Sequence, residues 1–146
     1  MTLDAHCVAT GLWVGGYPGS SVTLRHSFDV LVLCAEELQG VDTDIEVLRV
    51  PFDDTSAKQP PLSQLLEMAQ RINRRRLAGK RVLVTCAAGV NRSAFVAALA
   101  LVLEGRSAKA VIRRIRARRQ PPVGGHALRN ALFVALLKQV AERRAA

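Results

Sequence analysis

The segment VLVTCAAGVNRSA, residues 82–94, constrains the fold of this 146-residue chain more than any other stretch. It begins as a run of β-branched and apolar residues, which is typical of a buried strand. It ends at the start of a stretch that is apolar nearly all round, which is typical of a buried helix. Gly89 lies between the two and permits the sharp turn that joins them. The segment therefore predicts a strand, a tight loop and a helix in succession.

Other short strands are expected on both sides of this unit in the sequence. Runs bounded by Gly, Pro or charged residues occur at 12–14, 29–34 and 45–50, as strands require. The run VLVLC has no polar residue, which indicates a strand covered on both faces. We therefore expect an α/β fold with a central mixed, mostly parallel sheet of about four to five strands, covered by helices on both faces.

Helical periodicity appears in the segments that follow these strands. Apolar residues recur at helical spacing from Leu62, with Leu77 on the same side and Gly79 as the stop. Ser107 is expected to cap a third helix. A last helix is expected to run through Leu128 and on to Val140. Since no linker or repeat separates these elements, residues 1–146 are expected to form a single domain.

The cysteines and the apolar runs limit the classes of protein that fit. Cys7, Cys34 and Cys86 have no CxxC spacing, which predicts reduced thiols and a cytoplasmic location instead of a disulfide framework or a zinc site. We expect no metal and no cofactor. The longest apolar run, 94–103, is shorter than the roughly 20 residues of a membrane span. A monomer without a membrane span is expected.

The formal net charge of +9 is unevenly distributed. Residues 1–60 carry nine acidic and three basic residues, whereas residues 106–146 carry eleven basic residues and one acidic residue. The field of the C-terminal part attracts anions such as phosphorylated protein, nucleic acid or acidic lipid. Solvated helix faces are the alternative explanation for most of these arginines.

Cys86 and Arg92 form the candidate chemical site. The cysteine ends the expected strand, and the arginine opens the expected helix six residues later. Backbone N–H groups of the loop and the positive end of the helix dipole converge there, which attracts phosphate and favours a thiolate over a thiol. The arginine supplies a planar fork of donors for two phosphoryl oxygens. Neither of the other cysteines has an arginine at this spacing.

The sequence CAAGVNRS resembles the CxxGxxR[ST] signature of the cysteine-dependent protein phosphatases, and the surrounding chain is similar to their compact dual-specificity branch. The likeness covers nearly the whole chain, including GLWVGG, VLVLCAEE, VPFDD and GRSAKAVIRRIRARR. It implies a phosphomonoester hydrolase that acts on phosphotyrosine, phosphoserine or phosphothreonine of a phosphorylated protein. The reaction would pass through a phosphocysteine intermediate and would need no metal or cofactor.

The resemblance also implies roles for single residues. Cys86 would be the nucleophile, Arg92 would hold the phosphoryl oxygens, and Ser93 would stabilise the leaving thiolate. The general acid maps to Asp54, with Asp53 as the weaker candidate. A phosphate or other oxyanion would bind to the loop, whose substrate-binding residues are Ala87, Ala88, Gly89, Val90, Asn91 and Arg92.

Besides a chain that is mainly an RNA-binding domain because of its Arg-rich helices, two alternatives stay open. RNA 5′-triphosphatase-like enzymes share the Gly-x-Asn-Arg sequence, but their loops would be expected to carry an extra His and to end in Thr, so nucleic acid is disfavoured as a substrate. A catalytically weak phosphate-binding module of the same fold is the other alternative, although such modules usually lack the Cys, the Arg or the acid. One departure is Thr85, which stands where the family nearly always has His; its hydroxyl is expected to bond a loop carbonyl or the thiolate.

Overall fold

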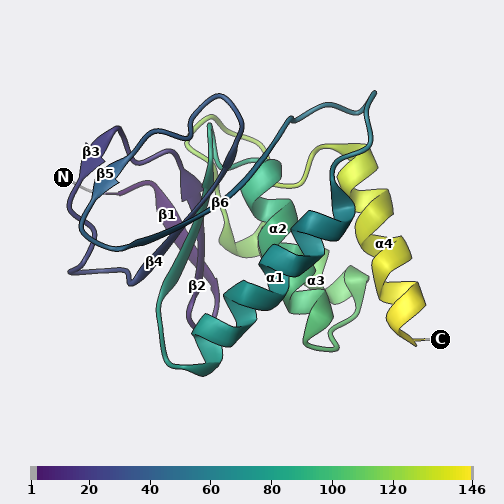
Figure 1. Cartoon of the computed structure of the whole chain (residues 1–146). Helices are drawn as coiled ribbons and strands as arrows, with labels where there is room; N and C mark the ends of the chain where they lie inside the picture. The colour runs from purple at the N-terminus through teal and green to yellow at the C-terminus, as the bar shows by residue number, and fades with distance from the viewer. Residues whose placement is uncertain (1–2, 146) are drawn as a thin grey trace.

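A five-stranded sheet forms the centre of the computed structural model, which describes residues 3–145 (Figure 1). Neighbouring strands in the order β2, β7, β4, β6 are parallel, and β1 pairs antiparallel with β2 at one edge. This confirms the expected mixed, mostly parallel sheet. The edge strand β1 was not predicted, because its sequence AHCVA alternates weakly. In sheet order the strands are β1 (Ala5–Ala9), β2 (Leu12–Gly16), β7 (Val82–Cys86), β4 (Val30–Ala35) and β6 (Glu46–Phe52).

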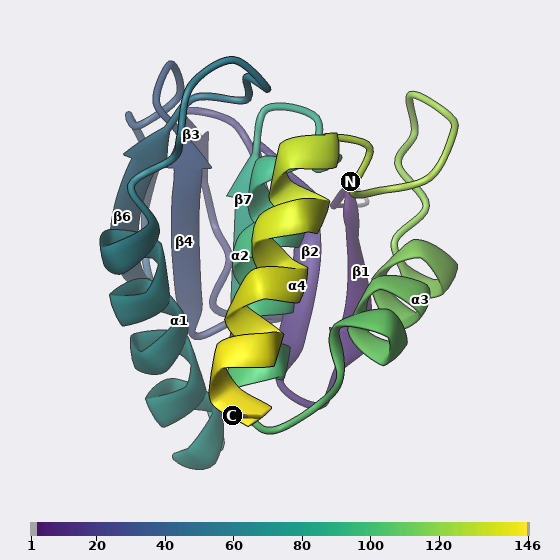
Figure 2. The same ribbon diagram turned by 90° about the vertical axis from the view of Figure 1, so that its right-hand side faces the viewer.

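The helices lie on one side of this sheet (Figure 2). The central helix α2 is buried along nearly its whole length and packs on β2, β4 and β7. The helices α1 and α4 pack on α2, and α3 packs on the edge strand β1. Alternate residues of each central strand, such as Val82, Val84 and Cys86, point into this helical core. The bounds are α1 (Leu62–Leu77), α2 (Arg92–Leu103), α3 (Ala108–Arg118) and α4 (Ala131–Ala145).

The opposite face of the sheet carries no helix in the part of the chain that the structure describes, so the expected helices on both faces were wrong. Leu31, Leu33 and Leu83 point to this face and pack against Leu24 and Phe28. The covering segments follow β2 and β4 and pair through two short strands, β3 (Ser21–Val22) and β5 (Asp42–Thr43). An apolar run shows that a strand face is covered but does not show what covers it. These connections lack the apolar period of a helix.

The helix ends agree with the sequence except at two positions. Ser107 accepts a hydrogen bond from the N–H of Ala110 at 3.1 Å and caps α3, as expected. Leu77 is 88% exposed because it lies at the end of α1, beyond the core. Leu128 lies before α4 in a left-handed conformation (φ 59°), and its N–H donates to the carbonyl of Val90. None of the helices between residues 3 and 145 is long and apolar enough to cross a membrane.

Candidate active site

The segment 82–94 folds as the sequence predicted. The strand β7 ends at Cys86, the loop follows, and α2 begins at Arg92. Both Cys86 and Ser93 are buried, and their Sγ and Oγ atoms lie 3.2 Å apart within hydrogen-bond distance. The structure therefore brings the expected nucleophile, the expected hydroxyl and the start of a buried helix to one place. The helix N-terminus adds positive potential there.

Gly89 is required by the shape of the loop. Its φ is +68°, a left-handed value that side chains with a Cβ rarely adopt. A Cβ at this position would also lie 2.6 Å from the carbonyl carbon of Gly15 and would collide with the guanidinium of Arg119. The loop can therefore close against β2 only with glycine here.

Arg119 supports the loop from its outer side, which the sequence did not predict. The side chain is completely buried, and its Nε and Nη2 donate to the carbonyls of Gly89 and Ala88 at 2.9 and 3.1 Å. Arg119 also forms a bidentate ion pair with Asp4, in which Nη1 and Nη2 donate to Oδ1 and Oδ2 at 2.6 and 3.0 Å. Its Nη1 lies 3.0 Å from Nδ1 of His6. A single buried cation therefore joins the loop to the segment around β1.

Two further contacts complete the outer side of the loop. The N–H of Tyr17 donates to the carbonyl of Ala87 at 3.2 Å, and the N–H of Leu128 donates to the carbonyl of Val90 at 2.8 Å. With Arg119, four successive carbonyls, 87–90, are thus held outward. Because the peptide group is planar and trans, each carbonyl held outward turns the N–H of the next residue inward. The inward side of the loop is therefore a concave set of donors, which suits an oxyanion.

Arg92 lies above the loop and is 5% exposed. Its Nη1 and Nη2 donate to the two carboxylate oxygens of Glu37 at 2.5 and 2.8 Å, and Nη1 also donates to the carbonyl of Phe52. The hydrogen bond to Arg92 lowers the pKa of Glu37 from 4.5 to about 2. The Nε of Arg92 is buried and has no hydrogen-bond partner among residues 3–145. One directed donor therefore stays free beside Cys86.

Glu37 was not predicted as a site residue. The signal for it is its position two residues after the end of β4, because ligands of parallel sheets bind at the carboxyl ends of the strands. The sequence VLVLCAEE does not distinguish it from Glu36, since only the fold shows which carboxylate faces Arg92.

Asp54 lies at the rim of the loop. Its two oxygens accept hydrogen bonds from the side-chain amides of Asn91 and Asn130, both at 2.9 Å. The Oδ1 of Asn91 in turn accepts the backbone N–H groups of Arg129 and Asn130. Asn91 therefore joins the loop, the candidate acid and the start of α4. Asp53 is exposed, and its side chain has no hydrogen bond in the described part of the chain.

Thr85 does not contact the thiol. Its side chain points to the opposite face of β7 from Cys86, and its hydroxyl donates to the carbonyl of Val32 on β4 at 3.1 Å. The expected bond to the thiolate or to a loop carbonyl was therefore wrong, because side chains alternate between the faces of a strand. Thr85 instead donates a hydrogen bond to the neighbouring strand.

Cys34 is the buried neighbour of the candidate nucleophile. The register that pairs Leu33 with Thr85 places Cys34 beside Cys86 on the helical face. Burial, followed by the nearby charge of Cys86, raises the pKa of Cys34 well above its ordinary value. Cys34 is therefore a neutral thiol, and Cys86 is the thiol that lies at the loop.

Comparisons with known proteins agree with this geometry. A family model described as "Dual specificity phosphatase, catalytic domain" matches residues 12–140. The solved structure of human DUSP28 is similar with a TM-score of 0.82 at 23% identity, over 100% of this chain and 98% of that one. Tk-PTP in its active form has a TM-score of 0.79 at 25% identity, over 98% and 99%. A mouse putative dual specificity phosphatase complexed with zinc tungstate has a TM-score of 0.80 at 22% identity, over 99% and 92%. No curated protein matches the chain.

Proposed function

The chain belongs to the dual specificity phosphatase family, and from that premise we propose that it hydrolyses phosphomonoesters of proteins through a phosphocysteine intermediate on Cys86. The observation that carries the proposal is the buried Nε of Arg92, which has no partner in the described part of the chain and belongs to the residue that ends the loop holding this thiol. An unpartnered buried donor is costly unless it has a ligand. A phosphoryl oxygen is a suitable ligand for a guanidinium in this position.

Substrate binding would use the inward side of the loop. The N–H groups that follow the outward-held carbonyls and the guanidinium of Arg92 would share the non-bridging oxygens of the phosphoryl group. Glu37 holds two nitrogens of that guanidinium, so the orientation of its Nε is set before substrate arrives. Preorganised donors of this kind stabilise charge in the transition state without reorganisation.

The first chemical step would transfer the phosphoryl group to sulfur. The Cys86 thiolate attacks phosphorus, an S–P bond forms, and the P–O bond to the protein side chain breaks. Asp54 donates a proton to the departing oxygen, which leaves as a neutral hydroxyl. The amides of Asn91 and Asn130 hold the Asp54 carboxyl at the rim, where a leaving group would lie.

The second step would return the enzyme to its starting state. Water attacks phosphorus, Asp54 takes the proton of that water, and the S–P bond breaks to release inorganic phosphate. The hydroxyl of Ser93, 3.2 Å from Sγ, would donate to the departing thiolate and stabilise it. The atoms balance with water as the only co-reactant.

The uncharged side chains of the loop support a phosphoprotein substrate over a phosphoinositide. Its side chains between Cys86 and Arg92 are uncharged, so the loop has no lysine for a second phosphate of an inositol head group. The structural neighbour PTPMT1, at 20% identity, was solved in complex with PI(5)P. A phosphoinositide therefore belongs in the test as a competing substrate, as does triphosphorylated RNA.

A hydrolysis panel tests the proposal. Wild type and Cys86→Ser are assayed with a phosphotyrosyl peptide, a phosphothreonyl peptide, a soluble phosphoinositide head group and triphosphorylated RNA. We expect the wild type to hydrolyse a phosphopeptide fastest and the variant to lose roughly a thousandfold or more in rate. Equal, near-zero rates for both proteins would indicate a binding module, and fastest release from RNA would indicate a triphosphatase.

A further inference from the structure

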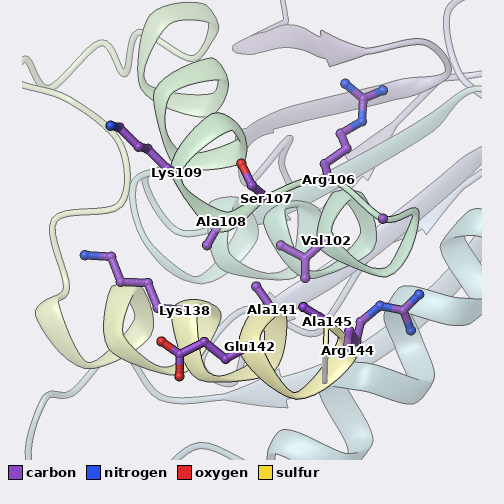
Figure 3. Close-up of a pocket in the computed structure, with 11 residues that line it drawn as sticks. Val102, Arg106, Ser107, Ala108, Lys109, Lys138, Ala141, Glu142, Arg144 and Ala145 are labelled. Atoms are coloured by element: carbon purple, nitrogen blue, oxygen red, sulfur yellow. The ribbon is translucent and has the colours of Figure 1, made fainter.

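The helices α3 and α4 form the walls of a groove (Figure 3). It contains no residue of the loop 87–92, which we call the phosphate loop. It consists of two adjoining hollows of about 540 and 580 Å³, and Lys109 and Lys138 line both. The first hollow, drawn in Figure 3, lies at the start of α3 and the end of α4. The second extends along α3 to Arg116. Nothing in the proposed reaction uses this groove.

The walls of the groove are strongly basic. Among residues 3–145, Glu142 is the only side-chain carboxylate that lines the two hollows. Lys109, Arg113 and Lys138 are exposed and form no ion pair within residues 3–145. A low-dielectric cleft lined by one sign of charge concentrates the opposite charge. The basic lining consists of Arg106, Lys109, Arg113, Arg116, Lys138 and Arg144.

The floor of the groove is apolar. Ala108 and Ile112, four residues apart on α3, face Val134 and Ala141 of α4 across the two hollows. Val102, at the end of α2, contributes to the first hollow. The groove thus combines an apolar stripe with cationic walls. It fits a ligand that has apolar side chains along one line and carboxylates beside them.

We propose that this groove binds an acidic, amphipathic segment of a protein partner. Its carboxylates would pair with Lys109 and Lys138, and its apolar side chains would cover Ile112 and Val134. Single-stranded nucleic acid fits less well, because none of the described residues that line the groove has an aromatic side chain to stack on a base. A membrane surface also fits less well, because the large exposed apolar residues, Leu77 and Val123, lie outside it. The proposal does not depend on the proposed function.

The test is a binding measurement with matched charge variants. The groove variant is Lys109→Glu/Lys138→Glu, and the control is Arg74→Glu/Lys80→Glu, which makes the same charge change at exposed positions at and beyond the end of α1. The probe is a fluorescein-labelled peptide of repeated Glu-Glu-Leu-Leu units, followed by anisotropy. Single-stranded RNA and vesicles containing phosphatidylserine are measured in parallel. Thermal unfolding of each variant checks that it is folded.

We expect the peptide to bind wild type, to lose roughly tenfold or more in affinity to the groove variant, and to bind the control within about twofold of wild type. Binding should weaken as salt rises, since the charges are exposed. Equal affinity for the two variants, or no binding to wild type, overturns the proposal. Tighter binding of RNA or vesicles that depends on Lys109 and Lys138 also overturns it. Because no turnover is needed, the result is independent of whether Cys86 is a nucleophile.

Discussion

The outer and inner sides of the phosphate loop each carry a buried arginine, and the two differ in their partners more than in their burial. Arg119, on the outer side, is 0% exposed and each of its guanidinium nitrogens has a partner. Arg92, on the inner side, is 5% exposed, and its Nε has no partner within the residues that the structure describes. An arginine whose donors are all hydrogen-bonded within the protein stabilises structure, whereas an arginine with an unpaired donor can bind a ligand. Burial alone does not distinguish the two roles.

Arg92→Lys should give the largest effect on the inner side. Lysine is a single point charge and lacks the planar fork that pairs with Glu37 and also faces the loop. We expect kcat on a small aryl phosphate to fall about a thousandfold, the size of effect seen when an oxyanion donor is removed. Because lysine cannot make both hydrogen bonds to Glu37, the variant should also lose some stability, and its urea midpoint is measured to check that it is folded under the assay conditions. A kcat within severalfold of wild type would contradict the assignment of Arg92 to the ligand.

Arg119→Met should mainly lower the free energy of unfolding. It leaves Asp4 and the carbonyls of Ala88 and Gly89 without their buried partner. Breaking a buried pair costs roughly 3–5 kcal/mol, and about 3 kcal/mol is expected here because the Asp4 side chain is 34% exposed. Urea unfolding measures the change. The neighbouring exposed residue provides the control, and Arg118→Met should change the free energy of unfolding by less than about 0.5 kcal/mol.

Asp54→Asn should lower kcat by about a hundredfold, because it removes the group placed to donate a proton at the rim. The loss should be greater for a phosphothreonyl peptide, whose leaving oxygen is more basic, than for an aryl phosphate. Asp53→Asn serves as the matched control and should leave kcat within about twofold of wild type. If the two substitutions have the reverse order of effect, Asp53 is the acid.

Glu37→Gln should give the smallest effect, a loss of stability that is present at neutral pH and disappears in acid. The ion pair with Arg92 lowers the pKa of Glu37 from 4.5 to about 2. A lowered carboxyl pKa contributes stability that is present above the unfolded value of 4.5 and is lost as the pH falls to about 2. Wild type should therefore lose more stability than Glu37→Gln between about pH 5 and about pH 3, measured by urea midpoints. Parallel losses would contradict the pairing.

The inner side of the loop was largely predictable from sequence because its parts are local. Cys86, Gly89, Arg92 and Ser93 lie within eight consecutive residues, and a strand, a turn and a helix start place them without reference to the rest of the chain. The family resemblance added Asp54, which the structure brings to the loop rim through Asn91.

The outer side could not be predicted, because distant parts of the chain supply it. Arg119 lies 30 residues from Gly89 and 115 residues from Asp4. In sequence it is one of eleven basic residues beyond residue 105, and nothing marks it as the buried one. Asn130 likewise reaches Asp54 across 76 residues. Only tertiary packing separates these side chains from solvated ones, as it also decides that loops cover the second face of the sheet.

Trapping the intermediate tests the central claim, that Cys86 carries the phosphoryl group, most directly. Wild-type protein is mixed with an aryl phosphate, quenched in acid within the first turnover, and digested for mass spectrometry. We predict that the peptide containing Cys86 gains the mass of one phosphoryl group, and that Arg119→Lys, if it folds, gains it as well. As the control, the Cys86→Ala variant should give no phosphorylated peptide. A phosphoryl group on any other residue, or turnover that persists in Cys86→Ala, would contradict the account.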